Sequence, residues 1–165
     1  MILKSILWCL LLALLPNSDA TPMADRHSTT ITSHKFLEMI RPHYLKTGDS
    51  VAIVAPAGIL KHDVEVIQKT KTLLNSWGLN VVFGDHLQTK FNHFAGTDAQ
   101  RSNDLQKALD HPNIKAIWCA RGGYGTLRIV DDLDFEGFKI HPKWVIGYSD
   151  ITVLHTALNN LGYES

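Results

Sequence analysis

Four short apolar runs, separated by segments long enough to form helices, constrain the fold of this chain more than any other feature. The runs span residues 50–55, 81–83, 114–120 and 144–147. They read as buried strands, and glycine, proline or polar residues bound them. Strands that alternate with helices at this spacing form βα units around a mostly parallel sheet. The sequence therefore predicts an α/β fold whose binding site lies at the carboxyl ends of the strands.

Capping residues and glycines mark the ends of the helices between these strands. We expect helices over about residues 64–77, 97–109, 126–133 and 151–161, with apolar residues recurring at helical spacing. Their start and stop signals are, in chain order, Asp63, Gly78, Thr97 or Asp98, and Gly162. No internal repeat interrupts the pattern, so one domain is expected.

Composition narrows the classes of partner. The chain has 165 residues, of which 45% are apolar and 19% charged, which suits one domain with a buried core. Lys and Arg together number 16, and so do Asp and Glu. This balance argues against a nucleic-acid interface and against a basic membrane patch. A small-molecule or peptide partner is expected.

Residues 1–20 read as a secretory signal peptide, with Lys4, a ten-residue apolar run over 6–15, and small residues at Ser18 and Ala20. A membrane anchor fits less well, because ten residues of helix rise only about 15 Å, about half of the hydrocarbon core. We expect a secreted or periplasmic protein that is free of the membrane once the signal is cleaved. Residues 21–44 are polar and irregular and read as a leader, which places the start of the domain at residue 45.

Cleavage at residue 20 would leave Cys119 as the single cysteine of the mature chain. An intramolecular disulfide is then excluded and a cysteine-based zinc site is disfavoured. No pair of histidines has the HExxH spacing of a helical metal site. We therefore expect neither a metal nor a cofactor.

Ser149 is the candidate nucleophile. Residues 144–152 read as a buried strand that breaks at this serine and turns directly into a helix. Such a corner exposes the hydroxyl at the edge of the sheet and puts the N–H of Asp150 at the helix N-terminus, where it can stabilise an oxyanion. The alternative is that Ser149 simply caps the last helix. The Asp150 carboxylate is expected to compensate the dipole of that helix.

A glycine loop over residues 121–125 follows the third strand. Its glycines either supply positive φ angles to a tight turn or leave backbone N–H groups open to an oxyanion or a carboxylate. The spacing does not match a dinucleotide-binding fingerprint. Arg121 either pairs with a substrate carboxylate or is an ordinary exposed arginine.

None of the histidines is well placed to activate Ser149. His155 follows it by six residues, about 240° around the helix and about 9 Å further along, so it should face away. His141 precedes the fourth strand and belongs near the opposite edge of the sheet, roughly 20 Å from the corner. The other histidines that we considered are expected to be ordinary exposed residues: His62, His86, His93 and His111.

Four motifs in this order resemble the LD-carboxypeptidases, also called muramoyltetrapeptide carboxypeptidases, and the related microcin self-immunity peptidases. They are APAG at 55–58, FAGT at 94–97, RGGYG at 121–125 and GYSDIT at 147–152. The resemblance covers about residues 45–165 and implies the N-terminal half of a two-domain enzyme with a flavodoxin-like or class I glutamine amidotransferase-like fold. It also implies a metal-independent serine peptidase that removes the terminal D-alanine from murein tetrapeptides. A homodimer of the complete protein is compatible with this family.

The resemblance assigns roles to residues. Ser149 matches the nucleophile, and the N–H of Asp150 with that of Gly122 or Gly123 matches the oxyanion hole. Arg121 and Tyr124 are expected to bind the substrate. In such enzymes the histidine and glutamate of the triad come from the C-terminal domain, which this chain lacks, so the chain alone is expected to be inactive.

Three alternatives stay open at this point. The protein could be a secreted module that binds a murein peptide without cutting it. It could be a self-immunity peptidase against a peptide-nucleotide antibiotic. Several LD-carboxypeptidases work in the cytoplasm, so that compartment is the alternative to secretion.

Overall fold

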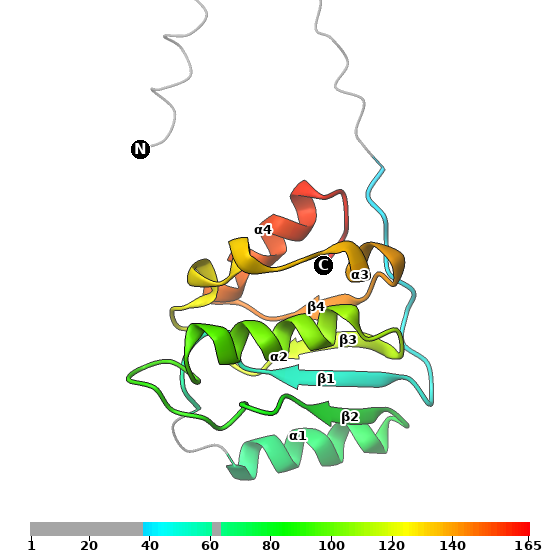
Figure 1. Ribbon diagram of the computed structural model, residues 1–165. Helices are drawn as coiled ribbons and strands as arrows, with labels where there is room; N and C mark the ends of the chain where they lie inside the picture. Colours follow the sequence, from blue (N-terminus) through cyan, green and yellow to red (C-terminus); the bar gives the residue numbers. More distant parts are fainter. Residues whose placement is uncertain (1–37, 61–63) are drawn as a thin grey trace, which may run out of the picture. The chain divides into compact units, whose positions relative to one another are not determined.

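The computed structural model describes residues 38–60 and 64–165, and a parallel sheet is its centre (Figure 1). The strands are β1 (Ser50–Val54), β2 (Asn80–Phe83), β3 (Ile114–Cys119) and β4 (Trp144–Ile146), in the order β2-β1-β3-β4. All three neighbouring pairs are parallel. The predicted α/β fold is confirmed. Because every strand runs the same way, the loops that follow them meet at one edge.

The helices are α1 (Val64–Ser76), α2 (Asp98–Asp110), α3 (Glu136–Ile140) and α4 (Thr152–Asn160). The helix expected over 126–133 is instead two 3-10 turns, η1 (Thr126–Arg128) and η2 (Val130–Asp132), which meet at Ile129 with φ −120° and ψ −14°. That residue is fully buried, so packing overrides helical geometry there. α3 was not predicted, because five residues are too short to show a helical period.

The predicted helix signals that fall on described residues are present. Thr97 caps α2 in a capping box with Gln100. Gly78 and Gly162 end α1 and α4 with φ values of +77° and +88°. Each closes a Schellman motif, for example through the hydrogen bond from Tyr163 N to Leu158 O at 3.0 Å. Asp63, the expected cap of α1, lies outside the described residues.

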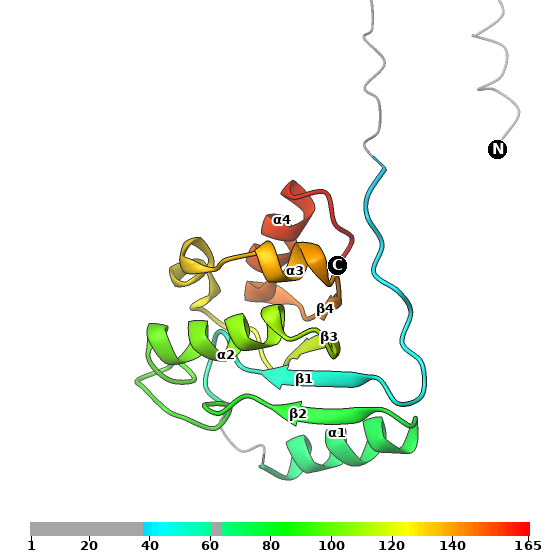
Figure 2. The same ribbon diagram turned by 45° about the vertical axis from the view of Figure 1, so that its right-hand side comes forward.

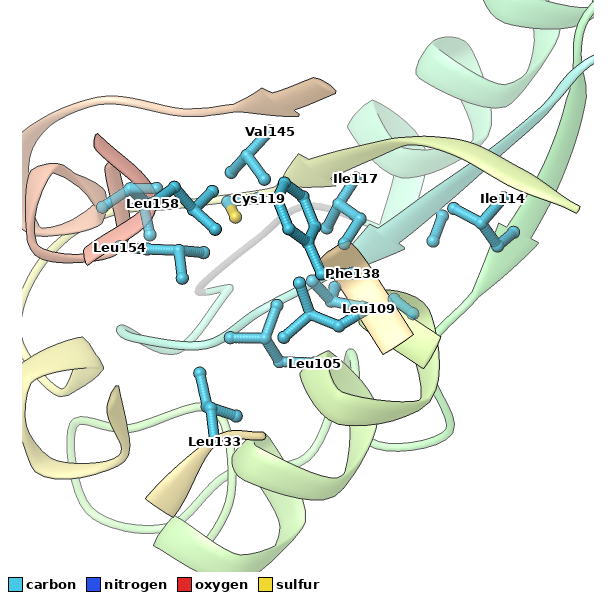
Figure 3. Close-up of a cluster of buried hydrophobic side chains, with 14 of the residues drawn as sticks. Leu105, Leu109, Ile114, Ile117, Cys119, Leu133, Phe138, Val145, Leu154 and Leu158 are labelled. Carbon is cyan, nitrogen blue, oxygen red and sulfur yellow. The ribbon is translucent and has the colours of Figure 1, made fainter. Parts of the chain in front are cut away.

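Side chains of the strands alternate between two cores on opposite faces of the sheet. α1 covers one face, where Ile67 and Leu74 pack with Val51 and Ile53. α2, α3 and α4 cover the other face (Figure 2). Figure 3 shows that second core; its labelled residues are Leu105, Leu109, Ile114, Ile117, Cys119, Leu133, Phe138, Val145, Leu154 and Leu158. The two cores fix both faces and leave the carboxyl edge to the loops.

Residues 40–44 belong to this domain, although the sequence placed them in a leader that ended at residue 44. Ile40 forms a parallel bridge with Tyr163, and Arg41 pairs with Glu164 at 2.6 Å. The ring of Tyr44 stacks on Trp144 with 6.1 Å between the centroids. The leader reading was wrong for these residues because their partners come from the far end of the chain. The expected signal peptide lies outside the described residues.

No helix within residues 38–60 and 64–165 has the length and hydropathy needed to span a bilayer.

Candidate active site

Loops from three βα units meet at the carboxyl edge of the sheet, as the sequence predicts. The N–H of Gly58, after β1, donates to the carbonyl of Gly122, after β3, at 3.1 Å. Ala95, in the turn before α2, donates to Ala57 at 3.0 Å. Backbone hydrogen bonds therefore connect the loops at this edge to one another.

Ser149 stands at the corner between β4 and α4, on an exposed position. The preceding residue, Tyr148, is extended with φ −151° and ψ 175°, and the 3-10 turn η3 (Ser149–Ile151) starts directly after it. Ser149 itself has a φ of +62°, in the left-handed region. Such a conformation costs a residue other than glycine about 1–2 kcal/mol, and strain of this kind gathers at functional sites.

The alternative that Ser149 caps the helix does not hold. Neither η3 nor α4 has a hydrogen bond from a capping side chain, and the residues at the two cap positions are Tyr148 and Ile151. The serine side chain is therefore not committed to the helix that follows it. Gly147 allows the sharp corner, because a Cβ there would lie 2.6 Å from Ile151 Cγ2.

The glycine loop lies against this corner. A Cβ added to Gly122 would come within 2.9 Å of both Ser149 Cβ and the carbonyl oxygen of Tyr148. Gly123 and Gly125 have φ values of +115° and +138°. The glycines therefore supply positive φ to a tight turn, as the first interpretation states, and Gly122 permits close approach to the corner. The assignment of Gly122 or Gly123 as an oxyanion donor stays a prediction.

Asp150 connects the corner to the glycine loop. Its Oδ2 accepts a hydrogen bond from the N–H of Thr126 at 2.8 Å, at the start of η1. The carboxylate therefore serves a neighbouring helical turn in addition to standing in the first turn of its own. The backbone N–H of Asp150 belongs to that first turn, where N–H groups have no partner within the helix. Its role as an oxyanion donor stays a prediction.

The two expected substrate-binding residues, Arg121 and Tyr124, belong to the glycine loop itself. Arg121 is partly buried, and its Nη1 donates to the carbonyl of Ile59 at 2.6 Å, which ties it to the loop after β1. Tyr124 is half-exposed, and its ring centroid lies 6.0 Å from that of Phe94 and 6.2 Å from that of His93. One nitrogen of Arg121 already has an acceptor, while the Tyr124 ring lies open on the surface.

His155 lies closer to the corner than the sequence suggested. Its Nε2 is 3.3 Å from the carbonyl oxygen of Gly147, and its Nδ1 is 2.8 Å from Ser165 Oγ. The expected angle assumed an α-helix from Ser149 onward. η3 advances about 120° per residue, which brings His155 to about 300° around the axis, close to the side of Ser149.

Both nitrogens of His155 are nevertheless occupied. A carbonyl can only accept, so in the neutral imidazole the contact with Gly147 places the proton on Nε2 and leaves Nδ1 to accept from the hydroxyl of Ser165. His155 therefore has no free nitrogen to take a proton from Ser149. His86, expected to be an ordinary exposed residue, pairs through Nδ1 with the buried Asp104 at 2.9 Å. His62 lies outside the described residues.

No sequence pattern singles out Arg101, a buried residue of α2. Only 1% of its surface is exposed. Its guanidinium donates to the carbonyl oxygens of Gly125 at 2.9 Å, Gly96 at 3.3 Å and Pro56, and it forms an ion pair with Asp98. Burial lowers the pKa of Arg101. A single arginine on a helix usually faces water, so only the three-dimensional contacts identify it.

Asp98 also binds Arg128, through contacts of 2.9 and 3.1 Å to Nε. The hydrogen bond from Arg128, followed by the charge of Arg101, lowers the pKa of the Asp98 carboxyl. In the described part of the chain, no group of three or more His, Cys, Asp or Glu side chains is arranged to hold a metal ion.

An α/β sheet with an exposed serine in the left-handed conformation at its carboxyl edge, beside a glycine loop, defines a class of domains built around a nucleophile corner. The family model described as LD-carboxypeptidase N-terminal domain matches residues 51–165. The chain therefore belongs to the LD-carboxypeptidase family, and the resemblance noted from its motifs is confirmed.

Comparisons with individual proteins agree. The chain is 38% identical over 113 residues to the murein tetrapeptide carboxypeptidase of Pseudomonas aeruginosa, an alignment that covers 68% of this chain and 36% of that protein. The structure of a muramoyltetrapeptide carboxypeptidase from Oxalobacter formigenes is 32% identical with a TM-score of 0.61, over 69% of this chain and 38% of that one. An MccF-like protein from Bacillus anthracis is 30% identical with a TM-score of 0.69, over 74% and 38%. The chain thus spans less than half of the length of each protein.

Proposed function

We propose that this chain carries the nucleophile-bearing half of a serine LD-carboxypeptidase that removes the terminal D-alanine from murein tetrapeptides. The observation that carries the proposal is the strained, exposed Ser149, whose Cβ lies against the backbone of Gly122. The names of the Pseudomonas and Oxalobacter relatives supply the substrate class. The family itself supports a peptidase.

In the proposed reaction, Ser149 Oγ attacks the carbonyl carbon of the penultimate residue. The negative charge that develops on the carbonyl oxygen is stabilised by the N–H of Asp150 and by one N–H of the glycine pair at 122–123. The C–N bond then breaks, D-alanine leaves with a proton, and an acyl-enzyme remains. Water attacks this ester and regenerates the serine.

The base that takes the proton from Ser149 is expected outside residues 38–60 and 64–165. His155 cannot supply it while its two nitrogens bind Gly147 and Ser165. The remainder of the longer relatives is the proposed source of a histidine and a glutamate. Without them, the hydroxyl keeps its proton, and only the small effect of binding and oxyanion donors remains.

The test joins this chain to the C-terminal part of the Pseudomonas relative and measures D-alanine release from a murein tetrapeptide. We expect the joined protein to release D-alanine and the Ser149→Ala variant to lose this activity. The 165-residue chain alone should release none. Ser76→Ala is the matched control, because the Ser76 hydroxyl donates to the carbonyl of Leu73 at the C-terminal end of α1. This substitution should leave the rate unchanged. Release that persists in Ser149→Ala would refute the assignment.

Two other functions can be separated in the same experiment. The 30% identity to the MccF-like protein favours a peptidase acting on a peptide-nucleotide compound as the second candidate. This second candidate predicts cleavage of a peptide-nucleotide compound and no release of D-alanine from the tetrapeptide. A peptide-binding module predicts neither reaction, together with an affinity for the tetrapeptide that Gly123→Ala weakens and Ser149→Ala leaves unchanged.

A further inference from the structure

Arg101 joins three loops at the carboxyl edge through one buried guanidinium. The three carbonyl oxygens that it binds belong to Pro56, after β1, to Gly96, before α2, and to Gly125, at the end of the glycine loop. These loops are separated in sequence, and backbone hydrogen bonds from Gly58 to Gly122 and from Ala95 to Ala57 also connect them. Arg101 adds a side-chain contact to all three loops, and it is the contact that holds the carbonyl of Gly125.

The glycine loop is fixed at both ends by these contacts. At one end, Gly58 donates to the carbonyl of Gly122 at 3.1 Å. At the other, Arg101 Nη1 donates to the carbonyl of Gly125 at 2.9 Å. The guanidinium packs directly on that residue, since a Cβ at Gly125 would lie 2.8 Å from Nη1. Gly123 and its N–H lie between the two fixed points.

The position of the loop is transmitted to the corner at Ser149. Thr126, which follows Gly125, donates to the carboxylate of Asp150 at 2.8 Å. Gly122 lies in contact with Ser149 at the other end of the loop. A shift of Gly125 would therefore change the distance between the serine hydroxyl and the N–H groups of the loop.

The chemistry of the contact requires arginine. A planar guanidinium distributes five N–H donors over three nitrogens: Nη1 donates to Pro56 and Gly125, Nε to Gly96, and Nη2 pairs with Asp98. Lysine has its three donors at one atom and cannot make all of these contacts. The buried charge is balanced by the ion pair with Asp98, and the Phe94 ring lies 4.9 Å from the guanidinium carbon. The Asp98 side chain is 37% exposed, so the pair is only partly buried, and burying the guanidinium still costs desolvation.

We propose that Arg101 is a positioning residue, which holds the glycine loop where its N–H groups can meet the oxyanion of the reaction at Ser149. The catalytic consequence rests on the proposed function, whereas the positioning itself is a statement about the loop and can be measured without activity.

The first arm of the test measures native-state hydrogen exchange of backbone amides in the 165-residue chain. Arg101→Lys should accelerate exchange at Gly58 and Thr126, whose N–H groups donate to Gly122 and to Asp150, at least about tenfold more than in β1 and β3. Arg128→Lys is the matched control, because Arg128 contacts the same Asp98 carboxylate and lies 5.5 Å from the same Phe94 ring, but its guanidinium is about half exposed. This control should leave the loop amides unchanged.

The second arm uses the joined, complete protein. Arg101→Lys should lower kcat for D-alanine release about 100-fold, the effect of losing one oxyanion donor, with KM within about threefold of the wild type. Arg128→Lys should change kcat less than about twofold. Should Arg101→Lys fail to fold, Gly125→Ala disturbs the same contact from the loop side and should give the same pattern in both arms.

Distinct results overturn the inference. Uniform acceleration of exchange across the sheet would show a purely structural role, as would an unchanged kcat or a rise in KM alone. If the wild-type joined protein releases no D-alanine, the proposed function fails. The exchange arm still decides whether Arg101 positions the loop.

Discussion

Replacing Ser149 by glycine should make this protein more stable, because the φ of Ser149 is +62°. The left-handed conformation costs an L-residue about 1–2 kcal/mol, a cost that glycine avoids. Against this, glycine loses more conformational entropy on folding than alanine, by about 0.5–1 kcal/mol. Comparing Ser149→Gly with Ser149→Ala removes the hydroxyl from both proteins and leaves the backbone as the difference. The expected gain of glycine over alanine is about 0.5–1 kcal/mol in the free energy of unfolding.

Urea unfolding and thermal melting of the two variants measure this difference, which corresponds to a rise in Tm of about 2–4 °C for a domain of this size. Thr152, the first residue of α4, supplies the control, because its φ of −53° is an ordinary right-handed value. There glycine should be about 0.5–1 kcal/mol less stable than alanine. If the glycine variant is less stable than the alanine variant at Ser149, as expected at Thr152, the corner is not strained and the reasoning is refuted.

Two further predictions concern buried groups away from the corner. Lys143→Met should lower the free energy of unfolding by about 2–4 kcal/mol in urea titrations. Lys143 Nζ donates to the carbonyls of Ala108, Leu109 and His111 at the end of α2, and methionine has no donor for these carbonyls. The control Lys115→Met should cost less than about 0.5 kcal/mol, and equal effects of the two substitutions would contradict the capping role of Lys143. Cys119 should resist iodoacetamide until the domain unfolds, because burial raises the pKa of its thiol to about 12. The measurement uses the Cys9→Ser variant, so that Cys119 is the single thiol. A labelling rate of the folded protein that increases between pH 7 and 9 would disprove the raised pKa of Cys119.

Local signals were sufficient to predict the sheet and the corner. The strands are short apolar runs, and their parallel pairing follows from βα alternation. Thr97, Gly78 and Gly162 act on backbone groups within a few residues of themselves, so their effects can be read from adjacent sequence. The break at Ser149 is local in the same sense, because β4 and the helical turns of η3 and α4 follow one another there within a few residues.

The contacts that organise the site could not be predicted in this way. Arg101 reaches Pro56, which is 45 residues away in the sequence, and Asp150 reaches Thr126, which is 24 residues away. No periodic pattern marks either pair, because each depends on where separate loops come to rest. Residues 40–44 were read as a leader for the same reason, since Arg41 finds its partner Glu164 only after the chain has folded.

The proposed reaction divides its requirements between two parts of the protein. The hydroxyl of Ser149 and the N–H of Asp150 come from the corner after β4, whereas the glycine N–H comes from the loop after β3. Their relative position therefore depends on contacts between these two loops, chiefly those of Gly122 with Ser149 and of Asp150 with Thr126. These contacts all lie within the described domain, and they need no proton acceptor to form. The base, in contrast, depends on these contacts, because it can take the proton only when the Ser149 hydroxyl is already in position. A second domain that brings a base to a prearranged corner would therefore change kcat by supplying proton transfer, while variants of Arg101 would change it by displacing the oxyanion donors. The loss of kcat without the base and the loss of kcat in Arg101 variants should multiply only if the corner keeps its geometry without the second domain. Hydrogen exchange at Thr126 in the 165-residue chain tests whether the contact between the corner and the glycine loop persists there.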